Sequence, residues 1–476
     1  MLAIFPMHDY GIAEGVEKQC LSLSAMPWNT PTHDLKEYFG EKIALYVVFL
    51  GHYSFYLLIP AIIGLIFQIV VWASGNYSVV AFYSLLIVAW GLVMLEYWRR
   101  QEHTTAMKWG MGTFENHEQN RPEFHGSLVR SHINGGEMVY FPEKEAQRLQ
   151  LFSRSIVSTF VLVVAAVVAG IYLVRFYLQQ DKDTSFFASS VASVMNAVQI
   201  QVFNLLYQDI VVHLTDNENH RTDTLYEDSM ITKLFLFQFI NSYSSFFFLA
   251  FVATFVTKPD GSHTCMEPLA VNLAIIFGTR LVFNNLLDIL LPYIRWRHKL
   301  KVETEGVAED VVLTPAEKDY LLVEYHSMLE NISSYSETTV QFGYGMLFIA
   351  ALPLATTLSL INNWARVKFY IYNLFRFYQR PSPTGAQDIG TWMSIFQFLA
   401  LAAVVTNAGL ICFTMDVLWN LYTIQYRLWI FIGFQWGLFM VQYIAAEMID
   451  DIPREVVIQK QRNEFINLKV GKDKYY

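Results

Sequence analysis

Long apolar runs, separated by short polar loops, make up most of the chain. Each run is about 20 residues or longer, the length that an α-helix needs to cross the hydrocarbon core of a bilayer. The pattern therefore predicts an all-α polytopic membrane protein with about ten transmembrane helices. The predicted spans are residues 42–72, 79–97, 156–177, 186–212, 232–256, 269–294, 335–352, 354–372, 389–415 and 428–446.

The composition supports this class of protein. Of the 476 residues, 54% are hydrophobic and 16% are charged, whereas soluble proteins carry about 25% charged residues. The net charge of −9, without a basic patch interleaved with aromatics, argues against nucleic-acid binding. The chain has no phosphate-binding glycine loop, no HExxH and no nucleophile elbow, so we expect it not to be an enzyme.

The basic residues predict the orientation. Lysines and arginines follow the second, sixth and eighth spans, and loops rich in these residues stay cytoplasmic. Both termini are then cytoplasmic, and the sequon at Asn76 lies outside, where it is a candidate for glycosylation. The predicted division is a cytoplasmic segment 1–40, a membrane domain 41–453 with cytoplasmic loops at about 99–150, 213–229 and 295–325, and a cytoplasmic tail 454–476. Plasma membrane and endomembrane are not distinguished.

One stretch of the sixth span is unusually polar. It carries Arg280, Asn284, Asn285 and Asp288. An ionisable group inside a membrane span indicates a functional site. Asn284 and Asp288 are four residues apart, so they share one face of a helix and could form half of a calcium site. The predicted topology places Asp288, Glu337 and Arg366 at similar depth on three consecutive helices. They form either an ion-pair network that only holds the helices together or a cation site at a gate.

Long motifs, in the same order, make the chain resemble the anoctamins, a family of calcium-activated chloride channels and phospholipid scramblases. The resemblance runs from about residue 5 to 466 and rests on FPMHD, EYFGEKIALYVVFLGHYS, EYWRRQE, RPEFHG, LTDNENHRTDTLYEDS, KLFLFQFINSYSSFFFLAF, NNLLDILLP, QFGYGMLFIAALPLATTLSLINN and DIGTW. It implies a ten-helix homodimer in which each subunit has its own pore or groove, lined by spans three to seven. It also implies a calcium site between spans six, seven and eight.

Four positions match the calcium ligands that the resemblance implies. They are Asn284, Asp288, Glu337 and Asn362, with aspartate at residue 288 in place of the usual glutamate. Three acidic ligand positions are lost, because they carry Ser334, Arg366 and Tyr370. Calcium affinity depends on ligand charge, and a guanidinium in the cage repels the ion. We expect calcium binding at this site to be lost, with Arg366 as a built-in counter-ion for Asp288 and Glu337.

The resemblance implies two further features. A peripheral calcium site between the ends of spans two and ten matches Glu96 and Asp451, although another acidic position of span ten carries Ala446. Gly278 matches a glycine at which span six bends, and it is interpreted either as a hinge or as a close-packing glycine between helices.

Polar and basic side chains in the spans are candidates for a pore or groove. Lys233 and Arg280 would favour anions or lipid phosphates if they line a water-filled path. Ser193, Asn196 and Gln199 make the fourth span unusually polar, as a scramblase groove requires. The alternative for this stripe is hydrogen bonding between helices.

Three functions remain open: an ion channel for chloride, a phospholipid scramblase that is constitutive or otherwise gated, and a non-transporting membrane tether. The expected partners are membrane lipids, chloride or other small ions, and a second copy of the chain. Full-length anoctamins carry a folded cytoplasmic domain before the membrane. Only about forty residues precede the first span here, so we expect this domain to be missing or the chain to be a fragment.

Overall fold

The computed structural model describes residues 4–22, 24–75, 77–115, 118–130, 135–180, 185–253, 266–305, 313–415 and 422–473. In the described residues, each predicted span falls mainly on a long helix, and in three spans the helix adjoins a π-helical turn, so the all-α membrane fold is confirmed. The helices are α3 (Glu41–Ser74), α4 (Val80–Trp109), α5 (Glu143–Gln180), α6 (Ser185–Asp216), α7 (Asp223–Phe247), α9 (Met266–Thr279), α10 (Asn285–Glu303), α12 (Ser327–Leu347), α13 (Ala355–Arg376), α14 (Thr391–Gly409) and α15 (Ile424–Met448).

Seven helical stretches of the described residues are long and apolar enough to cross a membrane. They do not include α6, α12 or α13. These three helices carry the polar groups of the candidate site, and polar side chains in a membrane usually face protein or water. The number of spans therefore stays a prediction of about ten.

Shorter elements occupy the segments between and beyond the long helices. Three of them are π-helical turns, η4 (Phe248–Val252), η5 (Arg280–Asn284) and η6 (Leu410–Thr414), which adjoin α7, α9 and α14 respectively. The others are α1 (Tyr10–Leu21), η1 (Pro27–Asn29), α2 (Thr32–Phe39), η2 (Tyr77–Val79), β1 (Ser127–Arg130), β2 (Glu137–Tyr140), α11 (Pro315–Tyr320) and α16 (Arg454–Asp473). The strands β1 and β2 form an antiparallel pair within the predicted loop 99–150.

The helix α12 lies at the centre of the bundle, in contact with α3, α4, α7, α13 and α14. The residues from Thr338 to Ala351 are all buried, and Gly343 lets α7 approach closely, because a Cβ there would collide with the Tyr243 hydroxyl. Gly64 of α3 serves the same purpose: a Cβ there would lie 2.6 Å from Thr356 Oγ1 of α13. This packing fixes α12 and α13, which carry much of the candidate site, against a rigid core.

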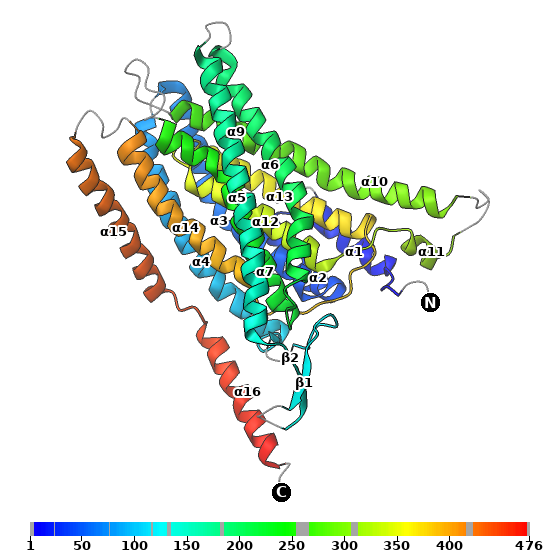
Figure 1. The fold of residues 1–476 in the computed structure, drawn as a ribbon. Helices are drawn as coiled ribbons and strands as arrows, with labels where there is room; N and C mark the ends of the chain where they lie inside the picture. The colour runs from blue at the N-terminus through cyan, green and yellow to red at the C-terminus, as the bar shows by residue number, and fades with distance from the viewer. Residues whose placement is uncertain are drawn as a thin grey trace.

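Other elements lie at the edges of the molecule. In Figure 1, α15 runs along one side and α16 continues beyond the bundle, whereas α10 projects from the opposite side. At the N-terminus, the His8 amide donates to Asp319 Oδ2 over 2.9 Å, and Arg376 Nε donates to Glu17 Oε1 over 2.8 Å. The segment before α3 is thus attached to the segments around α11 and the end of α13. The predicted domain boundaries and the orientation in the membrane stay predictions.

Candidate polar site between α6, α10, α12 and α13

The sixth span is interrupted where its polar stretch begins. The π-helical turn η5 joins α9 to α10, and such turns are frequent at functional sites because they change which side chains face a neighbour. Gly278 lies just before this turn, and a Cβ built there would meet no atom within 4 Å. Close packing against another helix therefore does not explain this glycine, and its role as a hinge stays a prediction.

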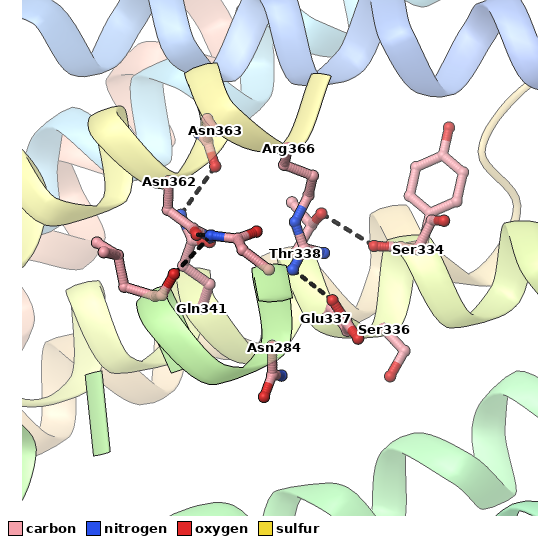
Figure 2. A network of polar contacts seen from close by, with 12 residues as sticks. Asn284, Ser334, Ser336, Glu337, Thr338, Gln341, Asn362, Asn363 and Arg366 are labelled. Carbon is pink, nitrogen blue, oxygen red and sulfur yellow. Dashed lines mark hydrogen bonds and ion pairs between the residues drawn. The ribbon is translucent and has the colours of Figure 1, made fainter. Parts of the chain in front are cut away.

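An ion pair lies at the centre of the site. A guanidinium nitrogen of Arg366 on α13 pairs with Glu337 Oε2 on α12, as Figure 2 shows. The Arg366 side chain is 9% exposed and that of Glu337 is 27% exposed. A charge in a membrane span is costly unless it is paired, so this contact accounts for the arginine at a position where the resemblance implies a carboxylate.

A ladder of amides connects three helices beside this pair. Asn285 Nδ2 of α10 donates to Asn362 Oδ1 of α13 over 2.6 Å, and Asn362 Nδ2 donates to Gln341 Oε1 of α12 over 2.5 Å. Gln341 Nε2 in turn donates to Asn363 Oδ1 over 2.8 Å. The amide oxygen of Asn362 is therefore already an acceptor. It is Asn285, and not the predicted Asn284, that reaches α13.

The two predicted ligands of the sixth span have different surroundings. Asn284 points away from the ion pair in Figure 2, and its Oδ1 accepts a hydrogen bond from Gln201 Nε2 of α6 over 3.1 Å. The backbone oxygen of Asp288 accepts from Asn373 Nδ2 over 2.7 Å. In the part of the chain that the structure describes, the Asp288 carboxylate has no hydrogen bond and no ion pair.

A cavity of about 300 Å³ unites these groups. It is lined by side chains of α3, α6, α7, η5, α10, α12 and α13, and six of the lining residues carry charge. The charged residues are Arg280, Asp288, Arg295, Glu330, Glu337 and Arg366. Asn284, Ser334 and Tyr370 also line it, whereas Asn362 borders a small adjoining void. The structure thus brings together nearly all positions that the resemblance assigns to calcium.

These residues do not fit a calcium ion. Calcium takes six to eight oxygen ligands, several of them from carboxylates. Among the described residues, no three His, Cys, Asp or Glu side chains group closely enough to hold a metal ion. The Glu337 carboxylate already has a cationic partner, and the amide oxygens of Asn284 and Asn362 already accept hydrogen bonds.

An arginine also lies between the two predicted residues of the peripheral site. Arg99 NH1 is 3.5 Å from Glu96 Oε2 and 3.4 Å from Asp451 Oδ1. Glu96 is 6% exposed, so this contact provides positive charge beside a buried carboxylate. A guanidinium thus connects the middle of α4 to the segment after α15, and the peripheral calcium site stays a prediction.

The two basic residues predicted for a pore are in different places. Arg280 lines the cavity, with its guanidinium carbon 5.3 Å from the centre of the Tyr344 ring. Lys233 does not line it. Its Nζ donates to Glu218 Oε2 and to Ser229 Oγ, each over 2.7 Å, at the connection between α6 and α7. This lysine neutralises a buried glutamate, and its role in a pore stays a prediction.

The polar stripe predicted for the fourth span faces another helix. Asn196 Nδ2 donates to Ser245 Oγ over 2.9 Å and Gln199 Nε2 donates to Asn241 Oδ1 over 2.6 Å, and Ser193 is buried beside them. The alternative interpretation, hydrogen bonding between helices, therefore holds for this stripe. A second polar stripe of α6, at residues 201, 204 and 208, lines the cavity. Its spacing of three and four residues could have shown it in the sequence.

Asn76, the predicted glycosylation site, lies outside the described residues. The other predicted site residues are all described.

The fold and the site define a polytopic α-helical membrane protein with a polar cavity inside its helix bundle. The sequence model of the family described as "Anoctamin: Calcium-activated chloride channel" matches residues 35–463. The chain therefore belongs to the anoctamin family, which includes chloride channels and scramblases.

Individual relatives support this assignment. The chain is 30% identical to anoctamin-7 of Homo sapiens over 82% of its own length and 49% of that protein. It is 29% identical to anoctamin-10 of Homo sapiens over 99% of its length and 71% of that protein. It is 28% identical to anoctamin-3 of Homo sapiens over 81% of its length and 47% of that protein. The chain thus spans about half the length of several curated relatives that it matches.

Proposed function

We propose that this chain conducts chloride or other small anions passively across the membrane, without gating by calcium at the site between α10, α12 and α13. One observation carries the proposal: the Arg366–Glu337 ion pair occupies the place where the family's calcium ligands meet. A guanidinium is always charged at physiological pH, so it provides a permanent positive charge where a relative would bind a cation.

The cavity supports passage of an anion rather than a catalytic step. Arg280 and Asn284 line both the main cavity and the void beside it, and they provide a positive charge and an amide along the same wall. Charges and hydrogen-bond donors that line a path determine which ions pass through it. The positive charge of Arg366 is neutralised by Glu337. Of the two other arginines that line the cavity, Arg280 also borders the adjoining void, so it is the arginine that we expect to attract the anion.

Phospholipid scrambling is the second candidate, and the position of the cavity favours it. The helices α6 and α10 flank the cavity and expose apolar side chains on their other faces: Val202 and Leu206 on α6, and Leu286 and Leu290 on α10. A lipid headgroup needs a polar path next to lipid-exposed helices, because crossing the hydrocarbon core unaided is costly. The hydrogen bond from Gln201 to Asn284 crosses between these helices and would close such a path.

Reconstitution into liposomes separates the candidates. Chloride efflux is measured together with dithionite quenching of a fluorescent lipid, on the same vesicles and against protein-free vesicles. Chloride efflux without quenching beyond the outer leaflet supports a channel, and quenching of both leaflets supports a scramblase. If neither chloride efflux nor lipid scrambling is detected, transport is contradicted and the membrane tether remains.

The proposal includes a homodimer, with membrane lipids and small anions as the other partners. Large apolar side chains such as Trp429 and Trp436 are exposed on α15. They are suited to contact with lipid or with a second copy. Single-molecule photobleaching of labelled protein in membranes tests this part: two bleaching steps support the dimer and a single step contradicts it.

A further inference from the structure

A second cavity, of about 470 Å³, lies on another side of Ile332 of α12, which lines both cavities, and it has a strong negative charge. It is bordered by the start of α3, the segment after α4, the starts of α7 and α12, and the segment before α14. Six carboxylates and one amine line it. The carboxylates belong to Glu115, Glu118, Asp223, Glu227, Asp228 and Asp388, and the amine to Lys42. We call this space the acidic cavity.

Only two of these carboxylates have a cationic partner among the described residues. Lys42 Nζ pairs with Glu227 Oε1, and Arg121 Nε pairs with Asp223 Oδ1 over 3.0 Å. The carboxylates of Glu115, Glu118, Asp228 and Asp388 have no ion pair in that part of the chain. The acidic cavity therefore keeps four negative charges that nothing described in the protein neutralises.

Hydrogen bonds hold three of the four unneutralised carboxylates in place. Thr391 Oγ1 donates to Asp228 Oδ1 over 2.5 Å, and the Gly390 amide donates to Asp388 Oδ1 over 2.7 Å. The Thr224 amide donates to Glu118 Oε1 over 2.9 Å. The fourth carboxylate belongs to Glu115. Its burial, and then the negative charges of Asp388, Asp228 and Glu118, raise the pKa of Glu115.

Two buried polar groups that line the cavity lack a partner. Asn331 is 7% exposed and Tyr335 is 2% exposed, and they are four residues apart on one face of α12. Neither Asn331 Oδ1 nor the Tyr335 hydroxyl has a hydrogen-bond partner among the described residues. Leaving a buried polar group unsatisfied costs about 1–3 kcal/mol, so two such groups beside four carboxylates without an ion pair point to a ligand.

The arrangement favours an organic cation over a metal ion. No three acidic, histidine or cysteine side chains of the described residues are grouped closely enough to hold a metal. The charges are instead spread around a large space with an aromatic wall, in which the rings of Tyr335 and Trp392 stack at 6.0 Å. Aromatic faces attract alkylammonium groups. A linear chain with several separated amines matches both features.

We propose that the acidic cavity binds a polyamine, a linear organic cation with two or more protonated amines. Its amines would pair with Glu115, Asp228 and Asp388, and one of them would donate to Asn331 Oδ1 and the Tyr335 hydroxyl. A bound polyamine would connect the start of α7 to α12, the helix that also carries Glu337. This site is independent of the transport proposed above.

Isothermal titration calorimetry on the purified full chain in detergent tests the proposal, with spermine as the probe at physiological salt. Saturable binding is expected, since unspecific attraction to exposed charges is screened under these conditions. Glu115→Gln and Asp388→Asn should each weaken binding about tenfold, because each removes one charge-assisted hydrogen bond. Asp450→Asn, an exposed carboxylate outside the cavity, is the control and should leave binding unchanged.

Tyr335→Phe tests the orphaned hydroxyl separately. This change removes a single oxygen, so we expect several-fold weaker spermine binding with no fall in the melting temperature. Equal spermine affinity in the wild type and in the three cavity variants would overturn the proposal. A second result would also overturn the proposal: calcium or magnesium binds, spermine does not displace it, and the cavity variants abolish its binding. The cavity would then be a metal site.

Discussion

Arg366 on α13 forms an ion pair with Glu337 on α12, and Asp288 on α10 lines the same cavity without an ion pair or hydrogen bond to its carboxylate in the described part of the chain. Two carboxylates and one guanidinium thus share the place where the resemblance implies a calcium site. Arg366 neutralises Glu337 directly. We infer that it also reduces the repulsion between Glu337 and Asp288, as a bound cation would.

Replacing the arginine with a carboxylate should create calcium dependence. Arg366→Glu gathers the charges of residues 288, 337 and 366, and calcium prefers such clustered carboxylates. We expect calcium to raise the melting temperature of this variant. Its free energy of unfolding should rise by about 2.7 kcal/mol when the calcium concentration is a hundred times the Kd for calcium. Wild type and Arg295→Glu, which changes an exposed arginine of the same cavity, should not respond. A variant that folds but ignores calcium would contradict this interpretation of the site.

The hydrogen bond between Gln201 and Asn284 should restrict the path between α6 and α10. Gln201→Ala removes a contact worth about 1 kcal/mol, which favours separation of the two helices. We expect faster chloride efflux or faster dithionite quenching in liposomes. Gln208→Ala is a matched control. Gln208 lines the same cavity from α6, and its side chain has no hydrogen bond to any described residue. Equal rates for both variants and wild type would show that this contact does not close the path.

Replacement by alanine should change the stability of the protein at one glycine of the spans and not at another. A Cβ at Gly64 would collide with the Tyr83 hydroxyl, the Pro353 oxygen and Thr356 Oγ1, so Gly64→Ala should cost about 1–3 kcal/mol. A Cβ at Gly278 would meet open space, so Gly278→Ala should keep the wild-type melting temperature. If residue 278 is a hinge, this variant should still change the transport rate. A strong loss of stability in Gly278→Ala would restore the close-packing interpretation.

The ion pair between Lys233 and Glu218 predicts a pH dependence of stability. Burial opposes the charged form of Glu218, but hydrogen bonds from His220, Lys233 and Ser229 outweigh it and lower its pKa to about 2. Because the pKa of Glu218 is lower in the folded than in the unfolded chain, the ionised carboxylate stabilises the fold at a pH above its unfolded pKa. This stabilisation is lost as the pH falls through the folded pKa. Glu218→Gln should therefore be less stable than wild type, by a constant amount above pH 4.5 and by a shrinking amount between pH 4.5 and about 2. If the difference in stability between wild type and Glu218→Gln stays constant throughout that pH range, the lowered pKa of Glu218 is contradicted.

Most of the long helices were predictable from the sequence because they are long apolar runs. The runs predict where helices lie but not which faces meet. Asn196 and Gln199 belong to a polar stripe in the sequence, yet they hydrogen-bond to α7, whereas Gln201 on a neighbouring face lines the cavity. Only the packing of α6 against its neighbouring helices separates these roles.

The candidate site was predictable in part. The topology placed Asp288, Glu337 and Arg366 at one depth, and the structure has all three around one cavity. The π-helical turn η5 has no simple sequence signal, and it is Asn285 rather than Asn284 that contacts α13. The acidic cavity was missed because its carboxylates come from distant segments with no shared motif.

Chloride efflux from proteoliposomes, measured with calcium and with a calcium chelator, tests the central claim most directly. We predict equal efflux rates in the two conditions, both above the rate of protein-free vesicles, because Arg366 provides a permanent charge at the site. Efflux that requires calcium would contradict the account, since the ion would then bind and act in spite of Arg366.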